Sequence, residues 1–342
     1  MKIGKIPKYL KKYIKLMNYK HENSRYNGNI LVYDTSLKSD NLGDEIINFY
    51  CNKIFDELGI RVKYRIPTHV KPTREEEKEI SAEIPKLITG TNILSSKLEA
   101  PYLWNKPSKE YMFDNIVLMG NGWEMYTQSV TPYTKMFYKK MLSTNFYHSV
   151  RDEYSKQKLN NMGITRVLNT ACPTTWNLSV DFCKSIPKKK GKNVITTITD
   201  YSRDESNDWF MLETLLNSYD NVYIWIQGER DLEYIRNFSR MNELKIVGRT
   251  LKAYNDILKN EDLDYVGTRL HAGIHALNNQ RRSIIVSIDN RAREMGRDIS
   301  LPIIERSDLK NSLVDLINTE WSTEIKLPMK SIELWKQQFI VS

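Results

Sequence analysis

The sequence predicts an α/β protein of two Rossmann-like halves that face each other across a cleft. Its 342 residues exceed the size at which one hydrophobic core usually stops growing, so two domains are expected. In each half, short runs rich in β-branched residues alternate with longer segments of helical periodicity. A Pro- and Lys-rich stretch separates the halves, and its composition is typical of a connection between domains.

The first half shows the alternation that a parallel sheet requires. Strands are expected at NILVYD (29–34), RVKYRI (61–66), KLIT (86–89), NIVLMG (115–120) and FYHSVRD (146–152). Helices are expected over 44–58, 131–142 and 153–162. In the first of these helices, apolar residues at helical spacing predict an inward face made of Ile46, Ile47, Tyr50, Ile54 and Leu58.

The second half is the clearer βα series. Its expected strands are NVITTIT (193–199), NVYIWIQ (221–227), LKIV (244–247), LDYVGT (263–268) and RSIIVSI (282–288). Helices are expected between them over 207–218, 229–238, 251–260 and 269–278, and a last apolar helix over 332–339.

These patterns predict five segments along the chain. A basic extension covers residues 1–28 and is followed by the N-terminal Rossmann-like domain over residues 29–170. A linker over residues 171–192 leads to the C-terminal Rossmann-like domain over residues 193–325. The last segment, residues 326–342, is a C-terminal helix that crosses back onto the first domain.

The composition bounds the class of protein. With 40% hydrophobic, 27% charged and 11% aromatic residues the chain is typical of a folded protein. It lacks an apolar stretch long enough to span a bilayer and the apolar core of a signal peptide, so a cytoplasmic location is expected. Three cysteines without a CxxC pair favour neither a disulfide scaffold nor a zinc knuckle.

The positive charge is concentrated at the N-terminus. Residues 1–20 carry seven lysines and no acid out of a net charge of +9, so the remainder carries only +2. Nucleic-acid binding is therefore not predicted. Ile3, Ile6, Leu10, Ile14 and Met17 stand near helical spacing between the lysines, so this extension is either a peripheral contact with the inner face of the plasma membrane or a solvated segment packed on the body.

Three glycine-containing loops follow expected strands. They are Asn41-Leu42-Gly43-Asp44, Gly120-Asn121-Gly122 and the run from Gly267 to Gly273. In open α/β sheets, ligands bind beyond the carboxyl ends of the strands, where helix N-termini present free N–H groups. These loops are therefore the first candidates for a site.

The third loop, GTRLHAG, combines a cation, an imidazole and a helix start. Arg269 can grip a phosphate or carboxylate with two parallel hydrogen bonds, and His271 can give or take a proton near neutral pH. The alternative is a helix start whose histidine makes a hydrogen bond in the core. His275 lies four residues after His271, a spacing that also suits metal ligands, but without a third ligand nearby we expect it to be packed and expect no metal site.

The other candidates each have a structural alternative. Arg151 is either a ligand-binding residue or a surface arginine beside Asp152. Asp44 either orients an acceptor hydroxyl or caps its helix. The Gly120-Asn121-Gly122 loop is either part of the site or a tight turn, and the chain contains neither GxGxxG nor a Walker motif, so nicotinamide and ATP chemistry are not supported.

Three segments together resemble the bacterial polysaccharide pyruvyl transferase family. They are NLGDEIIN (41–48), SVRDEYSKQKLNNMGI (149–164) and GTRLHAGIHALNNQRRSIIVSIDNR (267–291), and the resemblance covers roughly residues 30–297. Its most specific part is the Arg269-Leu270-His271 triplet followed by Gly273.

The resemblance implies a GT-B-like fold with the acceptor on the N-terminal side and the donor on the C-terminal side. It implies phosphoenolpyruvate as donor, no cofactor, and a nucleotide-linked or lipid-linked sugar of a surface polysaccharide precursor as acceptor. The product would be a pyruvate ketal. His271 and Arg269 are the implied catalytic residues, and the other substrate-binding candidates are Arg151, Thr268, Leu270, Asn41, Gly43, Asp44, Gly120, Asn121, Gly122, Asn290 and Arg291.

Two other functions compete with a pyruvyl transferase. A GT-B-type glycosyltransferase would place the diphosphate of a nucleotide sugar at the same helix terminus. A saccharide- or membrane-binding module would use the arginine and histidine only structurally. The sequence alone does not identify the sugar, the stereochemistry of the ketal or the oligomeric state.

Overall fold

The computed structural model of the protein describes residues 14, 16–19, 24–80, 83–99, 114–127, 129–260 and 262–340. Two compact units are distinguished by their contacts. Unit 1 comprises Met1–Lys38, Cys51–Cys172 and Met329–Ser342, and unit 2 comprises Ser39–Tyr50 and Pro173–Pro328. Most of the basic extension lies outside the described residues, so its membrane contact stays a prediction.

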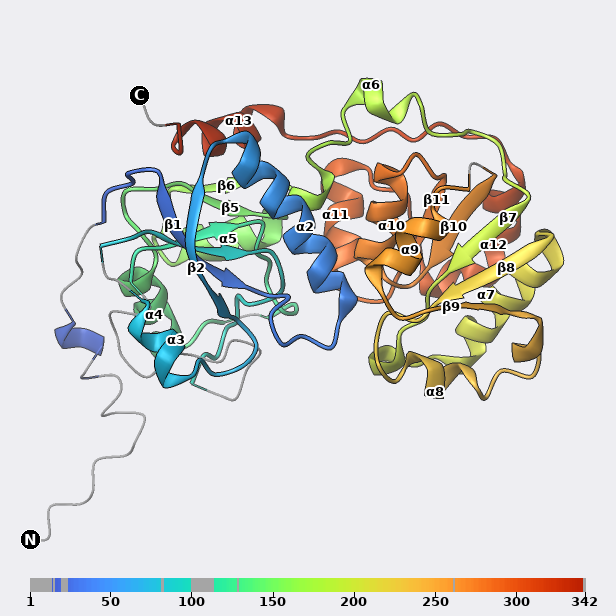
Figure 1. The fold of residues 1–342 in the computed structure, drawn as a ribbon, viewed down its shortest axis with the longest axis horizontal. Helices are drawn as coiled ribbons and strands as arrows, with labels where there is room; N and C mark the ends of the chain where they lie inside the picture. The colour runs from blue at the N-terminus through green and yellow to red at the C-terminus, as the bar shows by residue number, and fades with distance from the viewer. Residues whose placement is uncertain are drawn as a thin grey trace, which may run out of the picture. The chain divides into compact units, whose positions relative to one another are not determined.

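Unit 1 is built on parallel strands (Figure 1). Strands β1 (Asn29–Asp34), β2 (Arg61–Pro67), β3 (Lys86–Thr89) and β4 (Ile116–Met119) form a sheet in the order β2-β1-β3-β4. Strands β5 (His148–Val150) and β6 (Val167–Asn169) form a second parallel pair. An isolated bridge between Asn121 and Val150 connects that pair to the end of β4.

Several helices of unit 1 lie within its described residues from 24 onward. They are α2 (Leu42–Glu57), α3 (Arg74–Lys78), α4 (Pro132–Met141), α5 (Glu153–Asn161) and α13 (Met329–Gln337). Helix α2 begins in the segment that belongs to unit 2 and ends in unit 1. The inward face expected for it is confirmed at Ile46, Ile47, Tyr50 and Ile54, whereas Leu58 follows the end of the helix and is half-buried.

Unit 2 contains a six-stranded parallel sheet with the order β12-β11-β10-β7-β8-β9. Its strands are β7 (Asn193–Thr196), β8 (Asn221–Trp225), β9 (Lys245–Val247), β10 (Leu263–Gly267), β11 (Ser283–Ser287) and β12 (Ile303–Glu305). Counted from the first strand of this unit, the order is the 3-2-1-4-5-6 arrangement of doubly wound folds. The strand order therefore reverses between β7 and β10, which is where such sheets bind ligands.

The described helices of unit 2 are α6 (Val180–Cys183), α7 (Glu205–Ser218), α8 (Asp231–Ile235), α9 (Leu251–Ile257), α10 (Leu270–Asn278), α11 (Asn290–Ile299) and α12 (Leu309–Asn318). Helix α6 precedes the first strand of unit 2, and the other helices of this unit come after its strands. Strands β10 and β11 are buried along their whole length, as expected for a parallel sheet covered on both faces.

The predicted α/β class with two Rossmann-like parts is confirmed. Every expected strand and helix is present, although most are one to three residues shorter than expected. The sequence interpretation missed β6, β12, α11 and α12, as well as the short helices α3 and α6. It grouped Asn41, Gly43 and Asp44 with the N-terminal half, whereas their contacts lie within unit 2.

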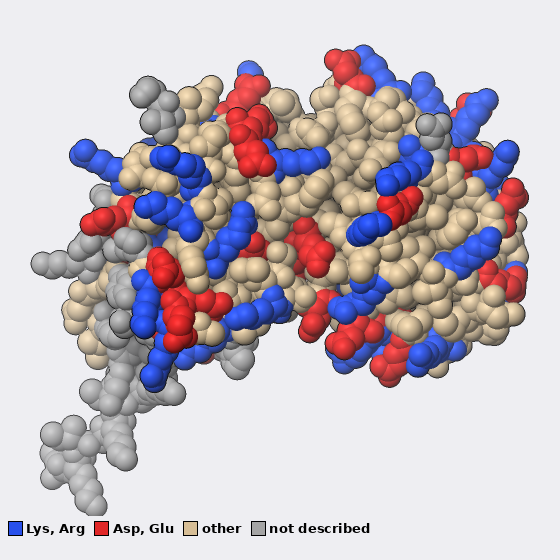
Figure 2. Space-filling model, viewed as in Figure 1, with Lys and Arg blue, Asp and Glu red and all other residues tan. Residues whose placement is uncertain are grey.

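Charged side chains of both signs are interspersed on the visible face of the molecule (Figure 2). This distribution agrees with a net charge that comes mainly from residues 1–20. Among the described residues, no helix is both long enough and apolar enough to cross a membrane.

The end of β10 approaches the backbone that follows β7 so closely that only glycine fits. A Cβ atom on Gly267 would lie 2.7 Å from the amide nitrogen and 2.9 Å from the carbonyl oxygen of Thr197. Because these are backbone atoms, they cannot turn aside as a flexible side chain can. The glycine thus permits the two strands to meet at the switch point.

We therefore expect Gly267→Ala to lower the free energy of unfolding by about 1–3 kcal/mol, the usual cost of overpacking. Gly248→Ala is the matched control, because the nearest atom to its added Cβ is the Ala253 Cβ at 3.9 Å. Because Gly248 is exposed, the free energy of unfolding of this variant should stay within about 0.5 kcal/mol of the wild-type value. Urea unfolding of both variants measures the difference, and equal stabilities would contradict the packing described.

Candidate active site

The first turn of α10 is tied to the end of β7 at the switch point of unit 2. The Thr268 amide donates to the Thr197 carbonyl at 3.0 Å, and the Arg269 amide donates to Thr197 Oγ1 at 3.2 Å. The Thr268 hydroxyl lies 2.8 Å from that of Thr199. Side chains at the start of α10 are thereby placed at the carboxyl edge of the sheet.

Arg269 is buried at this edge, with 4% of its surface exposed. Its Nε donates to the Ile198 carbonyl at 3.2 Å, and its Nη2 lies 2.5 Å from Asp231 Oδ1 and 3.5 Å from Asp200 Oδ1. Its Nη1 makes no hydrogen bond with any residue that the structure describes. One terminal nitrogen, rather than the pair expected from the sequence, therefore has no protein partner among the described residues.

The charges around Arg269 balance one another. Asp231 also accepts from the amides of Gly228 at 2.7 Å and Asp200 at 3.1 Å, and Arg230 Nε lies 3.3 Å from Asp200. Burial raises the pKa of Asp231, although the guanidinium of Arg269 opposes that shift. The two guanidinium groups and two carboxylates carry no net charge together. Arg269 therefore offers a hydrogen-bond donor of fixed orientation rather than an excess of positive charge.

The helix dipole supplies the remaining positive potential. Helix α10 has nine residues, its N-cap is Arg269, and no side chain caps its first N–H groups. A helix N-terminus is equivalent to roughly +0.5 charge. Leu270 and His271 form the first turn and are 6% and 7% exposed, so Thr268, Arg269, Leu270 and His271 all lie at the start of α10.

His275 is held from both ring nitrogens. Tyr50 Oη lies 2.8 Å from Nδ1, and Asn255 Oδ1 lies 2.6 Å from Nε2. Because the Asn255 oxygen can only accept, Nε2 carries the proton and Tyr50 donates to Nδ1. His275 is thus a packed residue, and no group of three potential metal ligands occurs in the part of the chain that is described.

The Asn41-to-Asp44 loop packs on the end of β8. Asn41 Oδ1 accepts from the Gly43 amide at 3.0 Å and from Gln227 Nε2 at 2.7 Å. Asn41 rather than Asp44 therefore caps α2, and Asp44 lies inside the first turn, where it accepts from the Ser39 hydroxyl at 2.6 Å.

Asn290 and Arg291 begin α11 at the neighbouring strand end. Asn290 is buried, with 7% exposed. Arg291 Nε donates to Asp289 Oδ2 at 2.8 Å, and its Nη2 donates to the Tyr201 hydroxyl at 2.8 Å. Tyr201 also lies with its ring 5.0 Å from Arg269 Cζ, which connects the two predicted arginines through one aromatic side chain.

In unit 1, the Gly120-Asn121-Gly122 loop is a tightly bonded turn. Asn121 is fully buried, and its side chain accepts from the Met119 amide and donates to the Gly90 carbonyl, both at 3.0 Å. Gly120 has a φ of 73°, a left-handed conformation that favours glycine. These contacts support the tight-turn alternative, although they do not test a role in binding.

Arg151 is a buried residue, 1% exposed, so the surface alternative is wrong. Its Nε lies 3.3 Å from Asp152 Oδ2, and its Nη2 donates to Asn92 Oδ1. A Cβ on Gly122 would overlap the guanidinium of Arg151. Glycine at position 122 is therefore required by the arginine that lies against it.

The family model of polysaccharide pyruvyl transferases matches residues 41–290. That match covers most of the chain. The chain belongs to the polysaccharide pyruvyl transferase family. Membership supports a transferase, and the matched range runs from the Asn41 loop to Asn290, so it includes nearly all of the candidate residues.

Several solved structures match the chain of this family member. One is the UDP-GlcNAc 2-epimerase of Methanocaldococcus jannaschii, with 12% identity, a TM-score of 0.44, and coverage of 90% of this chain and 97% of that one. The Neisseria meningitidis UDP-GlcNAc 2-epimerase has 10% identity, a TM-score of 0.42, and coverage of 92% and 94%. The wall teichoic acid polymerase TagF has 13% identity, a TM-score of 0.41, and coverage of 97% and 87%. Among curated proteins, none matches the chain.

Sequence reasoning missed three residues that shape the site of this family member. Asp231 and Asp200 orient Arg269, and Gln227 holds the Asn41 loop. Asp200 follows β7, which is the strand beside β10 in the sheet. Once the strand order is known, the switch-point rule identifies the loop after β7, but the order itself is not written in local sequence patterns.

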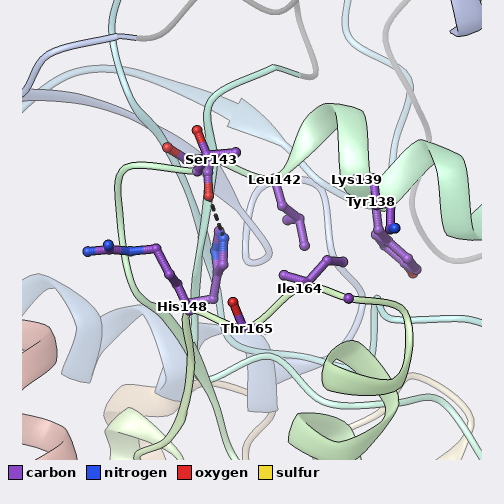
Figure 3. A pocket seen from close by; sticks show the side chains of 10 residues that line it. Tyr138, Lys139, Leu142, Ser143, His148, Ile164 and Thr165 are labelled. Carbon is purple, nitrogen blue, oxygen red and sulfur yellow. Dashed lines mark hydrogen bonds between the residues drawn. The ribbon is translucent and has the colours of Figure 1, made fainter.

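A pocket of about 180 Å³ lies in unit 1 where β5 begins, at the opposite end of that strand from Arg151. Leu142 and Ile164 face each other across it, and the ring of His148 points to Ser143 (Figure 3). His148 Nε2 donates to the Ser143 carbonyl at 2.9 Å, and Nδ1 accepts from the Leu118 amide at 3.4 Å. Burial lowers the pKa of His148 to about 4, so its imidazole is neutral at pH 7.

This lowered pKa predicts a pH dependence of stability. Between about pH 6.5 and pH 4, His148 is protonated in the unfolded chain but stays neutral in the folded chain. The free energy of unfolding therefore falls as the pH is lowered. The full effect is about 3 kcal/mol. His148→Gln can keep both hydrogen bonds without titrating, so urea unfolding at pH 7 and pH 4 should show a smaller loss for this variant. Identical losses in the two proteins would refute the assignment.

Proposed function

We propose that the protein transfers the pyruvyl group of phosphoenolpyruvate onto a sugar of a bacterial surface polysaccharide precursor, forming a pyruvate ketal and releasing phosphate. The observation that carries the proposal is the placement of Arg269 and His271 in one turn at the uncapped start of α10, at the switch point of unit 2. Family membership indicates the reaction class.

The charge of the donor suits this end of the helix. Phosphoenolpyruvate carries a carboxylate and a phosphate, and helix N-termini bind such anions through backbone N–H groups. The open Nη1 of Arg269 adds a charged donor whose direction is fixed by Asp231 and Asp200. Because these carboxylates already neutralise the guanidinium, we expect the helix end to supply much of the attraction for the donor.

The chemistry requires movement of protons next to the donor. One proton is added to the methylene carbon, two sugar hydroxyls form bonds to the central carbon, and the bond from that carbon to the phosphate oxygen breaks. The hydroxyl protons go to the new methyl group and to the released phosphate. We assign His271 as the acid/base that carries these protons, because imidazole can both give and take a proton near neutral pH.

The other predicted ligands keep proposed roles. Arg151 is proposed to bind the anionic donor. Asn290 and Arg291 are proposed to bind substrate. Whether the acceptor is nucleotide-linked or lipid-linked decides whether contact of the basic extension with a membrane would help the reaction.

The proposal predicts that phosphate is released from phosphoenolpyruvate only when an acceptor is present. His271→Asn should lower kcat by ~10²–10⁴-fold, the usual contribution of general acid–base catalysis. A coupled phosphate assay over a panel of nucleotide-linked and lipid-linked sugars measures the rate. The same substitution at His69, a half-buried histidine of unit 1, is the control and should leave kcat near that of the wild type.

Release of a nucleoside diphosphate from nucleotide sugars, with no turnover of phosphoenolpyruvate, would instead establish the glycosyltransferase alternative. Unchanged kcat in His271→Asn would remove the histidine from the mechanism even if the reaction class is right.

A further inference from the structure

An exposed aromatic ring stands at the same switch point. Tyr201 lies in a 3₁₀ turn, Asp200–Ser202, a few residues after β7, and 56% of it is exposed. Its position, beside Arg269 and at the carboxyl edge of the sheet, places it where this fold binds ligands.

Two arginines hold the Tyr201 side chain although it is exposed. Arg269 Cζ lies 5.0 Å from the ring centroid, within the range of a cation–π contact. Arg291 Nη2 donates to the phenol oxygen at 2.8 Å, and Arg291 is itself held by Asp289. The ring is thus fixed at its face and at its hydroxyl.

The backbone of the turn is fixed as well. The Asp200 amide donates to Asp231 Oδ1 at 3.1 Å, Arg203 Nε donates to the Asp200 carbonyl at 3.1 Å, and Arg306 Nη1 donates to the Ser202 carbonyl at 2.7 Å. A ring on such a turn loses little further conformational entropy when a ligand binds. Preorganisation of this kind favours binding.

We propose that Tyr201 is a stacking platform for a sugar ring. The exposed part of the phenol ring offers a flat apolar surface next to polar groups, which suits the apolar face of a pyranose. The assignment of that sugar to the acceptor rests on the proposed function.

The short distance to Arg269 favours a saccharide over a nucleobase. If phosphoenolpyruvate binds at the open nitrogen of Arg269, the acceptor hydroxyls must reach its central carbon. Because Arg269 lies over one face of the Tyr201 ring at 5.0 Å from its centroid, a sugar stacks on the other face, one aromatic ring away from the guanidinium. A base separated from its sugar by a diphosphate would lie farther away.

Saturation-transfer NMR on the full-length protein tests the platform directly. The probes are UDP-linked glucose, galactose and N-acetylglucosamine, the methyl glycosides of the same sugars, and UDP alone. We expect saturation of sugar-ring protons in at least one sugar probe with the wild type and with Tyr201→Phe, and its loss in Tyr201→Ala.

Tyr223→Ala is the matched control. Tyr223 also lies under a cation, Lys245 Nζ at 5.6 Å, but it belongs to β8 and not to the turn after β7. Its removal should leave the saturation unchanged. Absence of sugar saturation in the wild type, or its persistence in Tyr201→Ala, overturns the proposal. Saturation confined to the uracil ring overturns the choice of a saccharide.

Steady-state kinetics separates stacking from support of Arg269. Tyr201→Ala should raise the KM for the acceptor about fivefold or more, as expected for loss of one stacked ring, with the KM for phosphoenolpyruvate within about twofold of the wild type. An equal rise in both KM values would show that Tyr201 acts by holding Arg269, and would contradict a platform. If the wild type binds sugar at Tyr201 but releases no phosphate from phosphoenolpyruvate, the proposed function fails and the platform stands.

Discussion

The buried ion pair between Arg269 and Asp231 is the interaction on which the site of unit 2 depends. It joins the start of α10 to the start of α8. The contact between Arg269 and Asp200 connects the turn after β7 to the same arginine. Removing one partner would leave the other charge buried without compensation, which typically costs about 3–5 kcal/mol. The same pair gives the guanidinium a fixed direction and leaves its Nη1 without a protein partner among the described residues, so the side chain proposed to bind the donor is also one that supports the structure.

Both units contain a buried arginine that follows a strand and lies against a glycine. In unit 2, a Cβ on Gly228 would lie 2.6 Å from Arg269 Nη2, and in unit 1 a Cβ on Gly122 would overlap the guanidinium of Arg151. Each arginine also pairs with an aspartate and bonds a further side chain or carbonyl. The glycines are therefore needed for close approach of a guanidinium to the backbone, and not for positive φ. Substitution at either one would displace an arginine before it disturbed the sheet.

Local patterns in the sequence were sufficient for the architecture and for part of the site. Most strands contain buried β-branched or other apolar residues, and the Arg269-Leu270-His271 turn follows the buried strand β10, so both the strands and the turn could be predicted. Helix α12 was missed although Leu309, Leu313 and Ile317 recur at four-residue spacing and are buried. The roles of Asp231, Gln227 and Tyr201 depend on which strands are neighbours, and strand order is a long-range property that no local pattern encodes. For the same reason the sequence could not distinguish the surface and buried alternatives for Arg151.

The central claim is that the uncapped start of α10 and the open nitrogen of Arg269 form the anion-binding site of this family member. A crystal structure of the protein with phosphoenolpyruvate bound tests it most directly. We expect density for the phosphate or the carboxylate within hydrogen-bond distance of Arg269 Nη1 and the first N–H groups of α10, with the imidazole of His271 beside the donor. Well-defined phosphoenolpyruvate elsewhere in the molecule, with this helix end free of it, would contradict the account.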